Sequence, residues 1–443
     1  MTTKTARTIY SSLLVGLVIG LFTFFTAGSA AAQSTETALY KQIKGLPQVV
    51  SVEALKFKEP FTEKYLVRMK QWIDPNDTTV GSFTQRVFLS HYDLNAPMVI
   101  TTEGYGGDYA LRVSYIEELA KMFNTNQMLV EHRYFGESTP SPLNWNYLTA
   151  ANAAADHHRV TTTFKQIYKG KWIATGISKG GQTALIYRVL YPNDVDITVS
   201  YVAPLCFGVE DGRHEPFICC SLANAESREK VKAFQLEVLK RRNKLFPLFK
   251  NYCSEKQYTF NLPLQEIYDY CVLESSFSFW QWGWDVKTIP TAKASDTDHF
   301  NYLMRVCDPD YFALEGIGNH QAFYVQAAKE LGYYGYETEP FAKYLKIKTA
   351  KNYLQKIFLP DNTSFTFDNT LAKQCESYLN TEDPHMIFVY GGNDPWSAAA
   401  VQFSGKKNMY RAVAPGGSHT ARIASLPEDI KTEVTGRITE WLK

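Results

Sequence analysis

The sequence predicts an α/β fold in which a mostly parallel sheet is interrupted by a large insertion of helices. Two features of the hydropathy pattern support this prediction. After an opening of alternating strands, short and almost continuous apolar runs alternate with helical patterns, as in a parallel sheet buried on both faces. From about residue 205 to residue 383 the spacing becomes purely helical, and strand-like runs return only afterwards. We therefore expect a sheet domain of residues 33–204 and 384–443, with residues 205–383 inserted as a helical cap.

The sheet is expected to open with antiparallel strands. Residues 49–57, 65–73 and 82–91 alternate apolar and polar side chains and are separated by turn residues such as those of 74–77. The later strands are more continuously apolar, and parallel pairing is expected for them. They are residues 97–102, 127–131, 172–177, 194–201, 385–390 and 409–414. The helices predicted around them are residues 113–123, 147–168, 182–190 and 428–442.

Five stretches of the predicted cap place apolar side chains at the 3.6-residue spacing of helices, and their faces are rich in aromatic residues. They are residues 223–243, 264–282, 296–305, 311–331 and 341–357. A block of helices between two strands of one parallel sheet is best explained as an insertion that covers the sheet domain.

The net charge of the chain limits the kinds of partner that we expect. It carries 46 basic and 45 acidic side chains, a net charge of +1. This balance gives no electrostatic reason to expect nucleic acid or an anionic membrane surface as a partner. Beyond the N-terminal segment, no stretch is apolar enough to span a bilayer.

Residues 1–32 have the pattern of a signal peptide. Lys4 and Arg7 precede an apolar run over residues 9–25, and small residues follow before an expected cleavage after Ala32. An uncleaved membrane anchor is the alternative, although the apolar run is close to the lower limit for crossing a bilayer. Export is the better interpretation, and the sequence leaves periplasm and external medium open.

All seven cysteines lie after this segment. Export permits disulfides, but an odd number leaves at least one thiol unpaired. A bridge from Cys206 to Cys219 or Cys220 is one expectation, and several buried free cysteines are the other. No spacing of cysteines and histidines indicates zinc. We expect neither a metal nor an organic cofactor.

The stretch from Gly176 to Gly180 carries the clearest sign of chemistry. It reads Gly-Ile-Ser-Lys-Gly and matches Gly-x-Ser-x-Gly, the sharp turn that presents a nucleophilic serine between a strand and a helix. A side chain at either glycine would crowd the junction of the two elements. The pattern alone is weak, because chance produces it often, but its place after a predicted strand makes Ser178 a candidate nucleophile.

Two loops after the returning strands supply the partners that a nucleophilic serine needs. Asp394 follows the strand 385–390, and His419 lies in a Gly-rich loop after the strand 409–414. His419 would accept the proton of Ser178, and Asp394 would hold the imidazole in the correct tautomer. Taken singly, Asp394 reads as a turn former and His419 as a surface histidine. Together with the serine they follow the chain order of the α/β-hydrolase fold, which we therefore predict.

An oxyanion hole needs backbone N–H groups close to the serine. The N–H of Lys179 is one candidate, because it opens a predicted helix whose dipole favours negative charge. The second is expected from the glycine-rich loop 104–107, where we name Tyr105 and Gly106. An ordinary turn between strand and helix is the alternative for that loop.

Four motifs are spread along the chain. They are Gly-Ile-Ser178-Lys-Gly-Gly, Val130-Glu-His-Arg-Tyr-Phe-Gly-Glu-Ser138, Asn393-Asp394-Pro-Trp and Gly-Gly-Ser-His419. Together they resemble the secreted prolyl tri- and tetrapeptidyl aminopeptidases and, more distantly, lysosomal Pro-X carboxypeptidase and dipeptidyl peptidase II. The resemblance implies a serine exopeptidase that releases short peptides from a free N-terminus and favours proline at the cleaved bond. Lys179 and Gly180 after the serine fit the branch that releases tripeptides.

Such an enzyme must hold the cationic amine of its substrate at a fixed distance from Ser178, which calls for a carboxylate. The segments expected near the site offer Glu131, Glu137, Asp108 and Glu210. Glu131 has an alternative role as the ion-pair partner of Arg133. A proline pocket calls for flat aromatic walls, and Trp280 or Trp282 of the cap could supply one. Aromatic side chains at helical spacing are, however, more often core.

A cap over the site would exclude folded proteins and leave peptides as substrates. Within the same class, a dipeptidyl peptidase or a Pro-X carboxypeptidase-like enzyme is the alternative. Two other classes fit the same scaffold, an ester or lipid hydrolase and a peptide-binding protein without catalysis. Substrate profiling separates the first of these, and labelling of Ser178 separates the second.

Overall fold

The computed structural model describes residues 36–443, and within them nine strands form one sheet in the order β1-β2-β3-β5-β4-β6-β7-β8-β9. The strands are β1 Val49–Ala54, β2 Glu63–Trp72, β3 Ser82–His91, β4 Met98–Thr102, β5 Asn126–Val130, β6 Trp172–Ile177, β7 Ile197–Tyr201, β8 Met386–Gly391 and β9 Met409–Ala414. The predicted signal peptide, residues 1–32, lies outside the described residues.

The mode of strand pairing changes once across the sheet, from antiparallel to parallel. β1, β2 and β3 pair antiparallel, and β3 also pairs antiparallel with β5. From β5 to β9 every neighbouring pair is parallel. Every residue of β4, β5 and β7 is buried, as expected for parallel strands that are covered on both faces. The predicted antiparallel opening and parallel continuation are confirmed.

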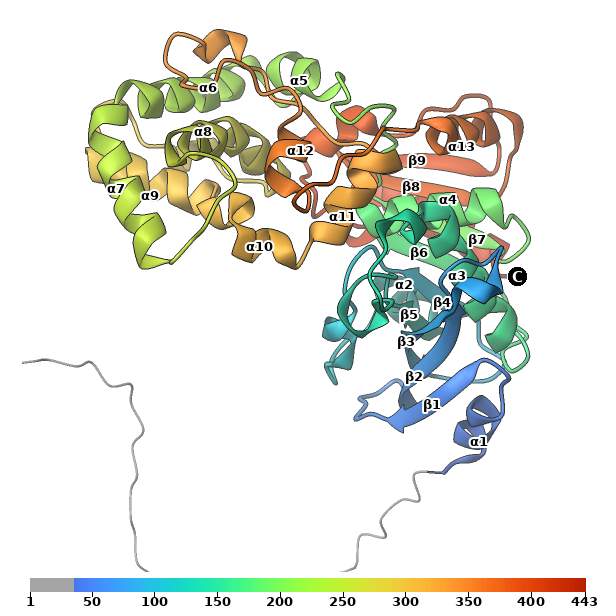
Figure 1. The fold of residues 1–443 in the computed structure, drawn as a ribbon. Coiled ribbons are helices and arrows are strands. Elements are labelled where there is room, and N and C mark those ends of the chain that lie inside the picture. Colours follow the sequence, from blue (N-terminus) through green and yellow to red (C-terminus); the bar gives the residue numbers. More distant parts are fainter. Residues whose placement is uncertain (1–35) are drawn as a thin grey trace, which may run out of the picture.

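Helices cover both faces of the sheet. Because side chains alternate along each strand, neighbouring residues contact different sets of helices. Met98 and Ile100 of β4 pack in one apolar cluster with α1, α3, α4 and α13. Val99, between them, packs in another cluster with α2 and α14. These helices are α1 Ala38–Lys44, α2 Glu118–Phe123, α3 Ala150–Phe164, α4 Lys179–Leu190, α13 Thr370–Thr381 and α14 Glu428–Trp441. Figure 1 shows α1, α2, α3, α4 and α13 around the sheet.

The remaining helices form a lobe beside the sheet domain (Figure 1). The lobe has a core of its own, which includes Leu245, Cys271, Leu303 and Leu354. Its helices are α5 His214–Pro216, α6 Ala225–Lys240, α7 Arg242–Glu255, α8 Leu264–Gln281, α9 Asp296–Val306, α10 Leu314–Gly318, α11 Gln321–Gln326 and α12 Tyr353–Phe358. α13 also follows residue 205 but packs on the sheet, against α4.

Several helices differ from their predicted extents. The stretch 311–331 is divided into the short α10 and α11, and α11 continues directly into a π-helical turn over Ala327–Leu331. The stretch 341–357 holds only α12 and a single 3-10 turn at its start, since Asn352 adopts a left-handed φ of 60° just before α12. α7 was not predicted, because Pro247 interrupts its helical signal. α2 begins late, since the Glu117 carboxylate caps its first N–H groups.

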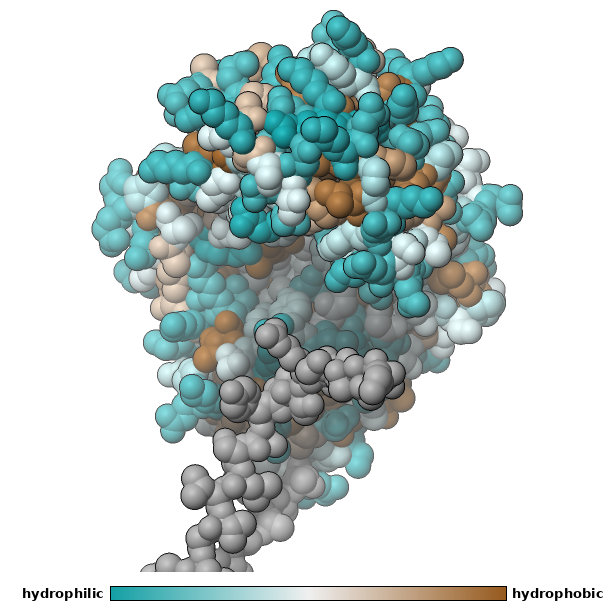
Figure 2. All heavy atoms as spheres, turned by 90° about the vertical axis from the view of Figure 1, so that its left-hand side faces the viewer, coloured by the Kyte–Doolittle hydropathy of each residue, from teal (hydrophilic) through white to brown (hydrophobic). Residues whose placement is uncertain are grey.

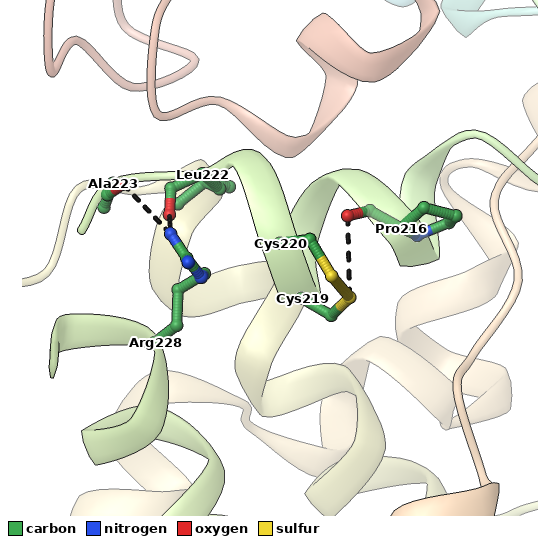
Figure 3. Close-up of a disulfide and its surroundings, with 6 residues drawn as sticks. All are labelled: Pro216, Cys219, Cys220, Leu222, Ala223 and Arg228. Carbon is green, nitrogen blue, oxygen red and sulfur yellow. Dashed lines mark hydrogen bonds between the residues drawn. A yellow bond between two sulfur atoms is a disulfide. The ribbon is translucent and has the colours of Figure 1, made fainter. Parts of the chain in front are cut away.

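The cysteines pair differently from one of our expectations. Cys219 and Cys220, adjacent in sequence, form a disulfide with each other in a single turn before α6 (Figure 3). The expected bridge from Cys206 to either of them is therefore wrong, and Cys206 is a buried free thiol. Four further cysteines are also buried and free, which confirms the other expectation. They are Cys253, Cys271, Cys307 and Cys375.

The outer surface of the lobe is mainly hydrophilic. Figure 2, which views the molecule from this side, shows small separate apolar patches among polar side chains. Within residues 36–443, no helix combines the length and the apolar character that crossing a membrane requires.

Candidate active site

Ser178 occupies a strained turn between β6 and α4. Its backbone has φ 56° and ψ −121°, a conformation that ordinary residues rarely adopt. A Cβ on Gly176 would collide with the Gly180 carbonyl and come within 2.9 Å of the Gly181 nitrogen. A Cβ on Gly180 would lie 2.8 Å from the Thr102 oxygen. The predicted need for glycine at both positions is confirmed.

The strained turn is held by hydrogen bonds on both sides. The Ser178 N–H donates to the Tyr201 carbonyl at the end of β7, at 2.8 Å. Its carbonyl accepts the Gln182 N–H at 2.9 Å and so begins α4. The side chain is left free to project from the carboxyl edge of the parallel strands, where α/β folds place their ligands.

Asp394 and His419 come from the loops after β8 and β9 and form a hydrogen-bonded pair. His419 Nδ1 lies 2.7 Å from Asp394 Oδ2, and the Asp394 Oδ1 accepts the Trp396 N–H at 3.1 Å. Asp394 is fully buried and His419 is 6% exposed. The loops are joined by an Asn393 N–H to Gly417 carbonyl bond of 2.8 Å. This arrangement directs Nδ1 toward the carboxylate and leaves Nε2 for the serine.

Ser178 and His419 line the same cavity, which has a volume of about 750 Å³ and lies between the sheet domain and the lobe. Within residues 36–443, no hydrogen bond joins the two side chains. Catalytic hydrogen bonds are often long in a free enzyme and tighten when substrate binds. The structure thus brings the three predicted residues to one place, with the Asp–His half of the relay already formed.

The predicted oxyanion donors differ in their surroundings. The Lys179 N–H is the first of α4 and has no carbonyl one helical turn before it. The Tyr105 N–H donates to Glu103 Oε1 at 3.2 Å, although Tyr105 lines the cavity. The Gly106 N–H has no partner among the described residues, but Gly106 does not line the cavity. Of the three candidates, only Lys179 combines a free N–H with a place beside Ser178.

The side chain of Lys179 links the turn to the neighbouring loop. It is 2% exposed, and its Nζ donates to the Gly104 carbonyl at 2.6 Å. Burial lowers the pKa of Lys179 to about 7, against the opposing effect of Glu103 and Glu330. The ammonium also lies over the rings of Tyr105 and Phe135. Lys179 therefore sets the distance between the serine turn and the loop 104–107.

The carboxylates named from the sequence do not line this cavity. Glu131 is fully buried and binds Arg86 Nε at 2.9 Å, the Gly107 N–H at 2.8 Å and the Ser138 hydroxyl at 2.7 Å. The suggested partner of Glu131 is wrong, because Arg133 pairs with Asp156 at 2.7 Å.

The other three candidate carboxylates also have partners within the protein. Glu137 pairs with Arg68, Asp108 with Arg86, and Glu210 accepts the Asn352 N–H. Each of these contacts supports a loop of the protein itself.

The structure places the two candidate tryptophans in different cavities. Trp282, at the end of α8, lines the cavity, and its ring centroid lies 6.3 Å from that of His419. It is 56% exposed, so its indole is available to a substrate. Trp280 is buried and lines a smaller cavity of about 120 Å³ elsewhere in the lobe.

Other cavity residues were missed by sequence reasoning. The aromatic ones are Tyr109, Tyr311, Phe323, Tyr324, Tyr333, Tyr334 and Trp396. The acidic ones are Glu103, Glu274, Asp308 and Asp310. One signal pointed to Glu274: it follows the apolar run Cys271-Val-Leu in the middle of a buried helix, where a charged residue is unusual.

The parallel sheet, the serine in a strained turn, and the Asp–His pair at the next two strand ends define a serine hydrolase with the α/β-hydrolase fold and a helical insertion. The comparisons with known proteins agree. The family described as PS-10 peptidase S37 matches residues 41–443. The chain therefore belongs to the S37 family of serine peptidases, and the predicted family resemblance is confirmed.

Individual relatives show how far the likeness extends. The prolyl tri/tetrapeptidyl aminopeptidase of Streptomyces mobaraensis is 30% identical and aligns with 98% of this chain and 92% of its own. The lysosomal Pro-X carboxypeptidase of Homo sapiens is 28% identical over 29% of each chain. Among solved structures, the proline iminopeptidase of Mycobacterium smegmatis matches 88% of this chain and 99% of its own, with a TM-score of 0.38 and 12% identity.

Proposed function

We propose that the protein is an exported serine exopeptidase that releases short peptides, chiefly tripeptides, from free N-termini by cleaving after proline. The observation that carries the proposal is the His419–Asp394 pair, 2.7 Å apart, in one cavity with Ser178 beneath the helical lobe. The similarity to a prolyl tri/tetrapeptidyl aminopeptidase over nearly the whole chain supports the substrate class.

In the proposed reaction, Ser178 Oγ attacks the carbonyl carbon of the scissile bond while His419 Nε2 takes its proton. Asp394 stabilises the resulting imidazolium. The Lys179 N–H, at the N-terminus of α4, donates to the oxyanion. When the carbon–nitrogen bond breaks, His419 returns the proton to the leaving amine. Water, activated by His419, then hydrolyses the acyl-enzyme.

The cavity suits a proline-containing peptide. Its apolar wall is largely aromatic, and Trp282 presents an exposed indole beside His419. Flat rings pack well on a pyrrolidine, which has no N–H to satisfy. The lobe over the cavity admits a flexible chain and excludes a folded protein. We infer a proline pocket that includes Trp282.

The proposal is tested with a peptide library, by mass spectrometry of the products of the wild type and of Ser178→Ala. We expect tripeptides that end in proline, released only from peptides with a free N-terminus, and no release by the variant. Release of free amino acids from C-termini would replace this proposal with a carboxypeptidase. Hydrolysis of acyl esters alone would replace it with an esterase.

Export is part of the proposal and rests on the N-terminal segment. Expression of the full chain in a bacterial host and N-terminal sequencing of the product test it. We expect a mature protein outside the cytoplasm that begins at or near Gln33. A full-length product that stays with the membrane fraction would instead support an uncleaved anchor.

A further inference from the structure

The two walls of the active-site cavity carry different charges. The wall formed by the lobe presents Glu274, Asp308 and Asp310. Within residues 36–443, no Lys, Arg or His lies within ion-pair distance of any of these three carboxylates. The cations of the opposite wall are Lys179 and Arg422, and both donate to backbone carbonyls. A cationic group of a substrate would therefore be drawn to the wall formed by the lobe.

Glu274 is the most firmly built of these carboxylates. It is 2% exposed and accepts hydrogen bonds from Tyr334 at 2.9 Å, Tyr336 at 2.7 Å and Ser278 at 3.1 Å. Three hydroxyls fix its orientation, but none supplies a positive charge. Burial accordingly raises the pKa of Glu274 to about 7. An ammonium ion is the partner that this site lacks.

The other carboxylates of the cavity fit that role less well. Glu103 accepts the N–H groups of Gly104 and Tyr105 and belongs to the loop beside the serine turn. Asp308 accepts the Tyr252 hydroxyl and the Asp310 N–H, and Asp310 is exposed. Attraction between charges is weaker in such a solvated position.

The helix that carries Glu274 runs along the cavity to the catalytic histidine. Glu274, Ser278 and Gln281 of α8 all line the cavity and lie on one helix face. The Gln281 carbonyl accepts the His419 N–H at 3.0 Å. Gln281 follows Glu274 by seven positions, which correspond to roughly 10 Å along the helix. Three residues of an extended peptide span about 10–11 Å.

We propose that Glu274 binds the N-terminal ammonium group of the substrate and so determines that three residues lie between this group and the cleaved bond. The inference rests on the proposed function, because it assigns the amine site of that same reaction. α8 then acts as a spacer between the amine site and His419. A substrate that presented its C-terminal carboxylate to the same wall would meet another carboxylate and be repelled.

The test compares two reporter peptides, Ala-Ala-Pro with a C-terminal chromogenic amide and its N-acetyl derivative, in the wild type and in Glu274→Gln. We expect the wild type to prefer the free amine by about 100-fold in kcat/KM, and the variant to treat both peptides alike. Asp310→Asn, an equivalent change on the same wall, should keep the preference within about threefold.

Two further measurements separate this inference from a loss of fold. A fluorophosphonate has no amine, so it should label Ser178 at the same rate in Glu274→Gln as in the wild type. If the glutamine variant does not fold, Glu274→Asp keeps the charge but shifts the carboxylate by one methylene. It should lose at least tenfold in kcat/KM on the free amine and retain the labelling rate.

The outcomes distinguish the two proposals. If the wild type cleaves both peptides equally, the aminopeptidase function itself fails. If the wild type prefers the free amine and Glu274→Gln retains that preference, only the assignment of Glu274 is overturned. Loss of the preference in Asp310→Asn alone would move the amine site to Asp310.

Discussion

The two walls of the active-site cavity are built by different physical means. On the sheet side, backbone geometry places the proposed reacting groups: Ser178 sits in a strained turn between glycines, and His419 and Asp394 follow strand ends. On the lobe side, side chains form the surface. Tyrosine hydroxyls surround Glu274, and Trp282 lies at the end of α8. We expect most substitutions in the sheet-side wall to abolish catalysis. In the lobe-side wall, single side chains can be replaced, and only the choice of substrate should change.

Removal of the proposed nucleophile should give the largest effect, and it changes the sheet-side wall alone. Ser178→Ala should lower kcat by about 10⁵- to 10⁶-fold, because the remaining two residues of the relay act only through the serine. The thermal midpoint should change little. Hydrolysis of a tripeptidyl-prolyl substrate and thermal unfolding measure both. A residual rate within tenfold of the wild type would place the nucleophile elsewhere.

A single added methyl group should disrupt the backbone of the serine turn in the same wall. Gly176→Ala places a Cβ against the Gly180 carbonyl, so α4 must shift away from β6. We expect a loss of stability of about 3 kcal/mol or more, with loss of fluorophosphonate labelling.

The matched control is Gly436→Ala within α14, where a Cβ meets nothing within 4 Å. It should increase the unfolding free energy by about 0.5–1 kcal/mol, because alanine favours the helix. Equal behaviour of the two variants in chemical denaturation would contradict the steric argument at the serine turn.

Glu131→Gln should separate stability from substrate recognition. The change leaves the buried Arg86 guanidinium with fewer anionic partners, and we expect a loss of about 3 kcal/mol in unfolding free energy. The preference for a free N-terminus should be unchanged, since Glu131 does not line the cavity. Denaturant unfolding and the paired reporter peptides give the two readouts, and a lost preference would return Glu131 to the substrate site.

Lys179→Met should change how stability depends on pH. Burial lowers the pKa of Lys179 from its ordinary value of 10.5 to about 7. Between these values the unfolded chain binds more protons than the folded one, so this lysine makes the unfolding free energy rise with pH across that window. In the methionine variant the rise from pH 7 to 10 should be smaller. Parallel slopes for the two proteins in denaturation at several pH values would show that Lys179 keeps its proton in the fold.

The smallest effect is expected at the disulfide of the lobe. Cys219 and Cys220 are adjacent in sequence and exposed, so their bond closes almost no loop and restricts the unfolded chain little. Replacement of both by serine should change the unfolding free energy by less than about 1 kcal/mol and leave peptide cleavage unchanged. A larger loss would mean that this turn supports the neighbouring α6.

The sequence alone determined the parts that depend on short-range geometry. The glycines around Ser178, the continuous apolar strands and the order of Ser178, Asp394 and His419 are local patterns, and each restricts its own segment to one conformation. They were sufficient for the fold and for the placement of the sheet-side wall. Glu131 shows the limit of such patterns: its motif placed it near the site, but only the fold showed that Arg86, rather than Arg133, is its partner.

Only the tertiary structure decided the lobe-side wall. Helical spacing places Trp280 and Trp282 on opposite faces but does not tell which face meets the cavity, and packing buries the first and leaves the second beside His419. Glu274 gains its hydroxyl partners from Tyr334 and Tyr336, which are about 60 residues away along the chain. The orientation of such side chains depends on contacts between distant segments. Those of Glu274 exist only once the lobe has folded, and the place of Trp282 beside His419 exists only once the lobe has packed against the sheet domain.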